Sequence, residues 1–216
     1  MEEKGQYIMS LDASTKVVGI AIFEDMGNHG ELKLLTYLTP KLKPTPATKT
    51  EELFQKVNLF RDEYLIKYKD LGIKTVVLEE PLLKSNNLYV ATTLIKYNGM
   101  LSKAIYDVLG IVPEYISSYD ARAYAFPELL AKRRFKKDGT PLTEKQIEKN
   151  DPVLFGAYDL NKTDKKKVVW DLVSDSYPSI IWERDKNGKL IKETYDLSDA
   201  LTCGIAYQYK NGLWDR

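Results

Sequence analysis

Four acidic side chains stand where a folded chain could do chemistry, at the ends of two predicted strands and at the start of a late helix. Asp12 follows the apolar run 7–11, and Glu79 follows the β-branched run IKTVVL. Asp196 and Asp199 open the segment YDLSDALTCGIAYQY, and their spacing places both carboxylates on one side of a helical turn. A carboxylate at a strand end is costly to bury unless it is paired, hydrogen-bonded or bound to a cation. If the four side chains converge, they predict a cation site.

The composition leaves few other groups for this chemistry. The chain has 216 residues with one His and one Cys, which excludes cysteine-based zinc sites, His-rich metal sites and most His-dependent triads. Ligation by oxygen alone selects hard divalent cations, Mg²⁺ or Mn²⁺. Two such ions, about 3.5–4 Å apart, can hold the attacking water and the leaving oxygen of a phosphoryl displacement. Mutual repulsion predicts that at least one carboxyl pKa is raised without metal.

Each acid also has a purely structural interpretation. Asp12 can cap the turn that follows it. Asp196 as an N-cap, with Asp199 three residues later, imitates a capping box. Glu79 and Glu80 can form a solvated acidic loop. Because successive strand side chains point to opposite faces, only one of these two glutamates can share the site of Asp12, and we expect Glu79.

The elements that must position these acids can be traced along the chain, which we expect to form one α/β domain with an insertion. Apolar alternation and turn residues predict three antiparallel strands first, and then helices alternating with short buried strands. The expected strands are 7–11, 17–23, 31–38, 73–78 and 111–116. The expected helices are 50–71, 87–109, 120–125, 166–172 and the one that starts at Asp196.

The helix 87–109 is apolar nearly all round, with Gly99 in its middle. Such a helix is buried on two sides. Either a second layer of this chain or a dimer partner must cover it. Cys203, one helical step beyond Asp199, is expected to be a buried, unreactive thiol.

Positive charge is local in this chain. The formal net charge is +1, so no molecule-wide basic field indicates a nucleic-acid partner. The segment 132–149, however, has seven Lys or Arg against three acids, inside an irregular insertion at approximately 127–162. A second basic run, KTDKKK, follows at 162–167. These runs are either solvated surface or contacts to a nucleic-acid backbone.

The order of these motifs resembles RuvC-type Holliday junction resolvases of the RNase H-like superfamily. The similar parts are the strand ending at Asp12, VVLEE at Glu79, the Asn-led helix and DLSDALTCGIAY. The resemblance implies a mixed five-stranded sheet of order 32145 flanked by helices, in a single domain over 1–216. It also implies a structure-specific endonuclease that cuts four-way DNA junctions with two Mg²⁺ ions, for which Mn²⁺ would substitute.

Carried over by position, the resemblance makes Asp12, Glu79, Asp196 and Asp199 the catalytic metal ligands. It places a homodimer seam on helix 87–109. Contacts to DNA are expected from Lys165, Lys166 or Lys167 and from the basic run of the insertion, which comprises Lys132, Arg133, Arg134, Lys136 and Lys137.

Two departures from the family pattern stand out. The first turn reads Asp-Ala-Ser-Thr where bacterial members commonly have Asp-Pro-Gly, and Pro81-Leu82-Leu83 stands where the family has an aromatic residue. The basic insertion can compensate for that aromatic. These features indicate a phage or mobile-element version. We expect a cytoplasmic location, or the host-cell cytoplasm if phage-encoded, and no membrane association, because no apolar run approaches about 20 residues.

Three other readings share parts of this pattern. The actin and sugar-kinase ATPases begin similarly but need Gly-rich phosphate loops and a second similar domain, which this chain lacks. An RNase H-like nuclease for other branched DNA or RNA would use the same metals and sheet. A non-catalytic junction-binding protein would have no reason to keep all four acids.

Overall fold

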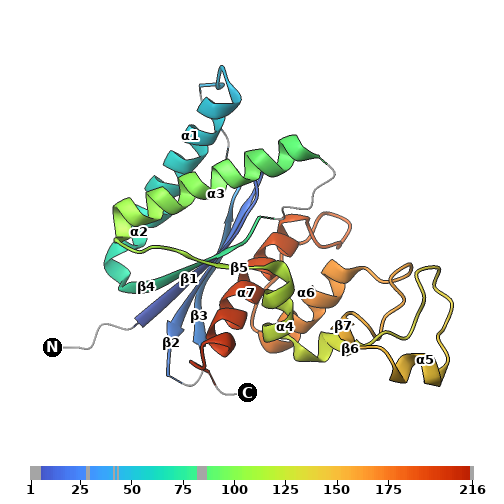
Figure 1. Cartoon of the computed structure of the whole chain (residues 1–216). Helices are drawn as coiled ribbons and strands as arrows, with labels where there is room; N and C mark the ends of the chain where they lie inside the picture. The colour runs from blue at the N-terminus through green and yellow to red at the C-terminus, as the bar shows by residue number, and fades with distance from the viewer. Residues whose placement is uncertain (1–5, 28–29, 41, 43, 82–86, 215–216) are drawn as a thin grey trace.

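The computed structural model describes residues 6–27, 30–40, 42, 44–81 and 87–214, and its centre is a five-stranded sheet of order β3-β2-β1-β4-β5 (Figure 1). The strands are β1 Gln6–Ala13, β2 Val18–Asp25, β3 Gly30–Leu38, β4 Ile73–Glu79 and β5 Glu114–Ile116. β1, β2 and β3 pair antiparallel, whereas β4 runs parallel to both β1 and β5. The sheet order 32145 and the mixed strand directions confirm the predicted fold class.

Helices cover both faces of this sheet. One face packs against α1 (Lys49–Phe60) and α3 (Leu88–Leu109), and the other against α7 (Glu193–Lys210). α4 (Ser118–Ala125) and α6 (Lys165–Ser176) pack against α7 in turn. Between α1 and β4 the helix continues through a π-helical turn (Arg61–Leu65), α2 (Ile66–Tyr68) and a 3₁₀ turn (Lys69–Leu71). It ends at Gly72, whose φ of 95° is left-handed.

α7 lies unusually close to the sheet because small residues line the contact. A Cβ atom on Gly19 of β2 would lie 2.3 Å from the carbonyl oxygen of Asp196. A Cβ on Gly204 of α7 would lie 2.4 Å from the ring of Phe23. Ser10 of β1, fully buried, donates a hydrogen bond of 2.7 Å to the carbonyl oxygen of Ala200. The backbone of α7 therefore rests directly on β1 and β2.

The region between α4 and α6 forms a small module beside the central sheet (Figure 1). It begins with a 3₁₀ turn (Pro127–Leu129) and contains β6 (Leu130–Lys132), α5 (Glu144–Glu148) and β7 (Pro152–Leu154). β6 and β7 pair antiparallel as a separate two-stranded sheet. The irregular insertion predicted at 127–162 thus contains short regular elements.

Several predicted boundaries differ from the observed ones. The strand expected at 111–116 forms only at Glu114–Ile116, directly after Pro113, which has no N–H to donate. α4 starts earlier than predicted because Ser117 caps it by accepting from the Asp120 N–H. Asp164 caps α6 in the same way, accepting from the N–H groups of the residues two and three further on.

The start of α7 is the most consequential difference. The helix begins at Glu193, with Lys192 at the N-cap, so Asp196 lies inside the first turn. The interpretation of Asp196 as an N-cap is therefore wrong. Among the described residues, the helices are too short or too polar to cross a bilayer.

Candidate functional site

Three of the four predicted carboxylates meet at the carboxyl ends of β1 and β4. Oxygen atoms of Asp12, Glu79 and Asp199 all lie within 4.8 Å of one another. Leu11 of β1 pairs with Leu78 of β4, so the next residues along these parallel neighbours lie at the same level, with Glu79 the last residue of β4 and Asp12 the last but one of β1. We refer to Asp12, Glu79 and Asp199 as the carboxylate cluster.

Strand alternation decides which side chains join this cluster. On β1, Ile8 packs in the core beneath α7, whereas Met9 and Leu11 pack in the core beneath α1 and α3. Asp12 therefore falls on the α7 side. On β4 the same alternation places Glu79 with Val77, which also belongs to the core on the α7 side. The following residue, Glu80, is exposed, as expected for the glutamate that turns away.

Close packing of α7 brings Asp199 to the two strand ends. Gly19 is the partner of Asp12 across β1 and β2, and it is the same glycine that admits the backbone of α7 at Asp196. The Ser10 hydrogen bond to Ala200 fixes the residue next to Asp199. Gly19 and Ser10 were missed by the sequence analysis, although a glycine inside a strand is a recognised signal of close backbone approach.

Asp196 lies one helical turn before Asp199 and outside the set of oxygens within 4.8 Å. Its charge nevertheless acts on the cluster, because it helps to raise the pKa of Asp12. The half-buried Asp196 also has a raised pKa, mainly from burial. It is near enough to interact electrostatically with the cluster and stays a predicted ligand.

Burial and mutual repulsion perturb the cluster strongly. Burial raises the pKa of Asp12 well above its usual range, and the charges of Glu79 and Asp199 raise it further. Burial, followed by the charge of Asp199, raises the pKa of Glu79 to about 7. These directions confirm the predicted raised pKa. A cation at this position would offset the repulsion, and oxygen donors suit Mg²⁺ or Mn²⁺.

Cys203 lies beneath the cluster, with its sulfur 4.0 Å from Oε2 of Glu79. It is fully buried, and burial raises the pKa of its thiol well above the usual value. A thiol that stays protonated is a poor nucleophile. The prediction of a buried, unreactive cysteine fits this environment.

Two cationic side chains face the carboxylate cluster through Asp199. Nη2 of Arg122 on α4 lies 3.5 Å from Oδ1, and Nζ of Lys166 on α6 lies 3.7 Å from Oδ2. Lys166 was a predicted DNA contact. Arg122 was not predicted from the sequence. A signal was available, because α4 follows β5, and β5 runs parallel to β4, so α4 begins at the end of the sheet where Glu79 lies.

The neighbours of Lys166 point to other partners. Nζ of Lys165 lies 5.7 Å from the ring centre of Phe155. Lys167 forms a 2.8 Å ion pair with Asp171. Of the three predicted lysines, only Lys166 therefore lies at the carboxylate cluster.

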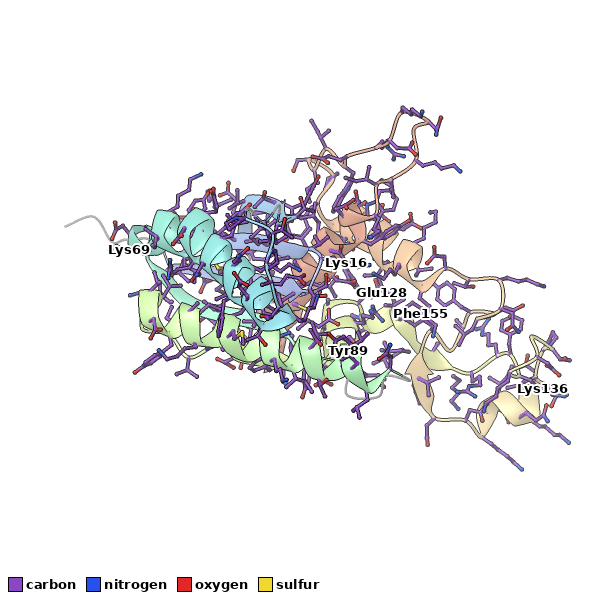
Figure 2. All side chains as sticks on the ribbon, turned by 90° about the horizontal axis from the view of Figure 1, so that it is seen from above. Lys16, Lys69, Tyr89, Glu128, Lys136 and Phe155 are labelled. Atoms are coloured by element: carbon purple, nitrogen blue, oxygen red, sulfur yellow. The ribbon has the colours of Figure 1, made fainter. Side chains whose placement is uncertain are left out.

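The predicted basic run is on the exposed surface of the β6–β7 module. Figure 2 shows Lys136 at one end of the molecule and Lys69 at the other. Lys132 donates to the carbonyl oxygen of Glu148 at 2.7 Å. Within the described ranges, four neighbouring cations form no salt bridge, and all are exposed: Arg133, Arg134, Lys136 and Lys137.

α3 has one covered and one uncovered face. Asn87 caps it, as predicted, by accepting from the Val90 N–H. Its inner side chains, including Leu101 and Ile105, are fully buried against α1 and the sheet. Other large apolar side chains of α3 remain exposed within the described part of the chain: Leu88, Tyr89 and Val90 in the first turn, and Ile95 and Tyr106, which lie on the same side of the helix as Leu88. A second layer of this chain, one of the two predicted alternatives, does not cover them.

The fold of this chain is similar to that of proteins of known structure. No protein-family model and no curated protein sequence matches the chain. The solved structure of T. thermophilus RuvC in complex with a Holliday junction substrate matches with a TM-score of 0.60 and 10% identity, over 96% of each chain. Another Thermus thermophilus RuvC structure matches with a TM-score of 0.56 and 13% identity, again over 96% of each chain. Together with the sheet order, these matches show that the chain has the RNase H-like fold of the RuvC-type resolvases.

Proposed function

We propose that this protein is a metal-dependent endonuclease that resolves four-way DNA junctions by hydrolysing phosphodiesters. The observation that carries the proposal is the carboxylate cluster, assembled from two parallel strand ends and α7 on a RuvC fold. Structure-specific cutting of junctions is what the likeness to RuvC supports, and the cluster supplies the chemistry.

In this proposal Asp12, Glu79 and Asp199, with Asp196 beside them, hold two Mg²⁺ ions, and Mn²⁺ substitutes. Bound Mg²⁺ supplies an activated water and stabilises the charge on the leaving oxygen. Asp12 would contribute its carboxylate oxygens from β1, the central strand of the sheet. Lys166 is placed to draw a phosphate towards the cluster, and Arg122 holds Asp199 in position through their contact of 3.5 Å.

The proposed partner is branched DNA bound by a homodimer. A junction has two strands to cut, so two copies of the site are needed for paired nicks. The exposed apolar side chains of α3 supply a self-complementary surface for that dimer. The unpaired cations of the β6–β7 module supply contacts to the DNA backbone.

Cleavage of four synthetic substrates tests the proposal. Purified protein is incubated in Mg²⁺, and separately in Mn²⁺, with a four-way junction, a Y-fork, an RNA–DNA hybrid and a linear duplex. We expect symmetric nicks in the junction and little cutting of the others. Asp12→Asn should abolish cutting while junction binding persists. Lys69→Ala should change neither, because Lys69 lies just before β4, at the opposite end of that strand from Glu79.

The same experiment decides between the candidate functions. Preferred cutting of the fork or the hybrid would identify an RNase H-like nuclease for other branched DNA or RNA. Junction binding without cutting in either metal would identify a non-catalytic junction-binding protein.

A further inference from the structure

A small cavity of about 230 Å³ opens in the β6–β7 module. Pockets that enclose whole drug-sized ligands run from about 300 to 1,000 Å³, so this cavity suits one flat ring better than a larger ligand. Cations and aromatic rings line it together: Arg133, Lys136, Lys137, Phe135, Phe155 and Tyr158.

Within the described residues the cations at this cavity form no salt bridge, and the one acid that interacts electrostatically with them is Asp138, whose pKa Lys136 helps to lower. Elsewhere in the described chain lysines are commonly paired, as Lys33 is with Glu24 at 2.8 Å and Lys103 is with Asp107. The nearby Asp159 is already held by Lys162 at 3.5 Å and by the Asn161 N–H. With Arg133, Lys136 and Lys137 in its lining against Asp138 nearby, the cavity presents an excess of positive charge, which favours an anionic ligand.

The aromatic wall is held rigidly. Phe155 is the one non-glycine residue with a positive φ, 60°, among the described residues, a strained conformation for a bulky side chain. Its N–H donates to the carbonyl oxygen of Leu129 at 2.7 Å, and its ring meets Tyr158 edge-on at 6.0 Å. Phe135 completes the lining and is half-buried. The module thus holds aromatic rings and free cations around one cavity.

The cavity is connected to the carboxylate cluster through consecutive residues of α6. Lys165 lies 5.7 Å from the ring centre of Phe155, and Lys166 lies 3.7 Å from Asp199. A strand whose phosphate is held at Lys166 can therefore reach the cavity within a short stretch of backbone.

We infer that this cavity binds one unstacked nucleotide of the DNA strand, with its base against the aromatic wall and its phosphate on Arg133, Lys136 and Lys137. This inference rests on the proposed function and assigns the β6–β7 module a specific role in it. Unpaired bases become available where DNA strands exchange or separate. Stacking on aromatic side chains accepts any base, so the pocket recognises the unstacked state and not a sequence.

Binding measured in EDTA, where no cutting occurs, tests this pocket independently of catalysis. The probes are a ten-nucleotide oligothymidylate and an abasic strand with the same phosphates. Wild-type protein should bind the thymidylate about tenfold more tightly, as expected for one stacked base. Equal binding of the two strands by the wild type would overturn the inference without any variant.

Two variants test whether the preference for thymidylate over the abasic strand arises at this cavity. Phe135→Leu keeps an apolar side chain but removes the ring, and should lower the thymidylate affinity to that of the abasic strand. Phe54→Leu, the same change at an exposed position on α1, should leave the tenfold preference intact. A base preference that survives Phe135→Leu would place it outside this cavity and refute the assignment.

Failure of the nuclease proposal and failure of the pocket assignment give different results in these experiments. If Asp12→Asn leaves cutting unchanged while the base preference depends on Phe135, the assignment of the carboxylate cluster fails and the pocket stands. If cutting depends on Asp12 and the wild type binds both strands equally, the pocket fails and the cluster stands.

Discussion

Protonation of single carboxyl groups links the stability of this protein to pH. Without metal, the pKa of Glu79 is about 7 in the folded chain, against about 4.3 in an unfolded one. The folded state then binds more protons between these two values. Stability is therefore highest below the unfolded pKa and falls as pH rises through the folded pKa.

Glu79→Gln should remove much of this pH dependence. Urea unfolding in EDTA from about pH 5 to about pH 8 is expected to show a shallower decline for the variant. At the alkaline end the variant should be more stable than the wild type by on the order of 2 kcal/mol. Excess Mg²⁺ should stabilise the wild type more than the variant. A parallel decline for both proteins would contradict the assignment of the raised pKa to Glu79.

Lys166 and Lys167 provide a matched pair of single-residue variants. Lys166 contacts Asp199 at the cluster, whereas Lys167 is paired with Asp171. Lys166→Met should lower the single-turnover rate of junction cleavage by about 10- to 100-fold, as loss of a charge-stabilising donor does. Lys167→Met should cost about threefold or less. Equal effects would show that Lys166 contributes only general positive charge.

At the scale of elements, the close packing of α7 against the sheet sets the geometry of the carboxylate cluster. Gly19→Ala would place a methyl group 2.3 Å from the Asp196 carbonyl oxygen, so the helix must shift. We expect a loss of about 1–3 kcal/mol in stability and a larger relative loss of cleavage, because metal ligands tolerate little displacement. A Gly19→Ala variant that matches the wild type in stability and cleavage would show that this contact does not set the position of α7.

The outer face of α3 gives a prediction about assembly. Ile95 is 44% exposed. The variant Ile95→Glu would place a charge in the proposed apolar dimer seam. Sedimentation should show Ile95→Glu as a monomer at concentrations where the wild type is a dimer, with uncoupled single nicks in place of paired ones. Met26→Glu, at an equally exposed apolar position after β2, should stay dimeric. A wild type that sediments only as a monomer would refute the seam itself.

Sequence patterns predicted the elements well wherever burial alone shaped them. The five strands and the approach of Asp12 to Glu79 were predicted from apolar runs that end in acids, and the strand order was predicted from the family resemblance. The start of α7 did not follow, because Asp196 has the residue type and spacing of a cap and yet lies within the helix. Arg122 was also missed, since pairing between α4 and α7 is set by packing between segments far apart in the chain.

At the scale of the whole molecule, the formal net charge is only +1, so under the proposed function we expect the exposed cations of the β6–β7 module to supply much of the attraction to DNA. Replacing its four unpaired cations, Arg133, Arg134, Lys136 and Lys137, with Ala should weaken junction binding. The slope of log affinity against log salt concentration should fall by about three to four. A Lys69→Ala variant, at the opposite end of the molecule from Lys136 (Figure 2), should leave the slope unchanged. An unchanged slope in the fourfold variant would exclude the module from contact with phosphates.

The hydrogen bond between Ser10 and Ala200 joins residues 190 positions apart. Synthesis proceeds from the N-terminus at about 5–20 residues per second, so Asp12 and Glu79 leave the ribosome well before α7 exists. The three carboxylates cannot meet until the C-terminal helix has emerged and docked on the sheet. If the protein is the nuclease proposed above, a partly made chain is unable to cut DNA, because the carboxylate cluster assembles only after α7 has been translated.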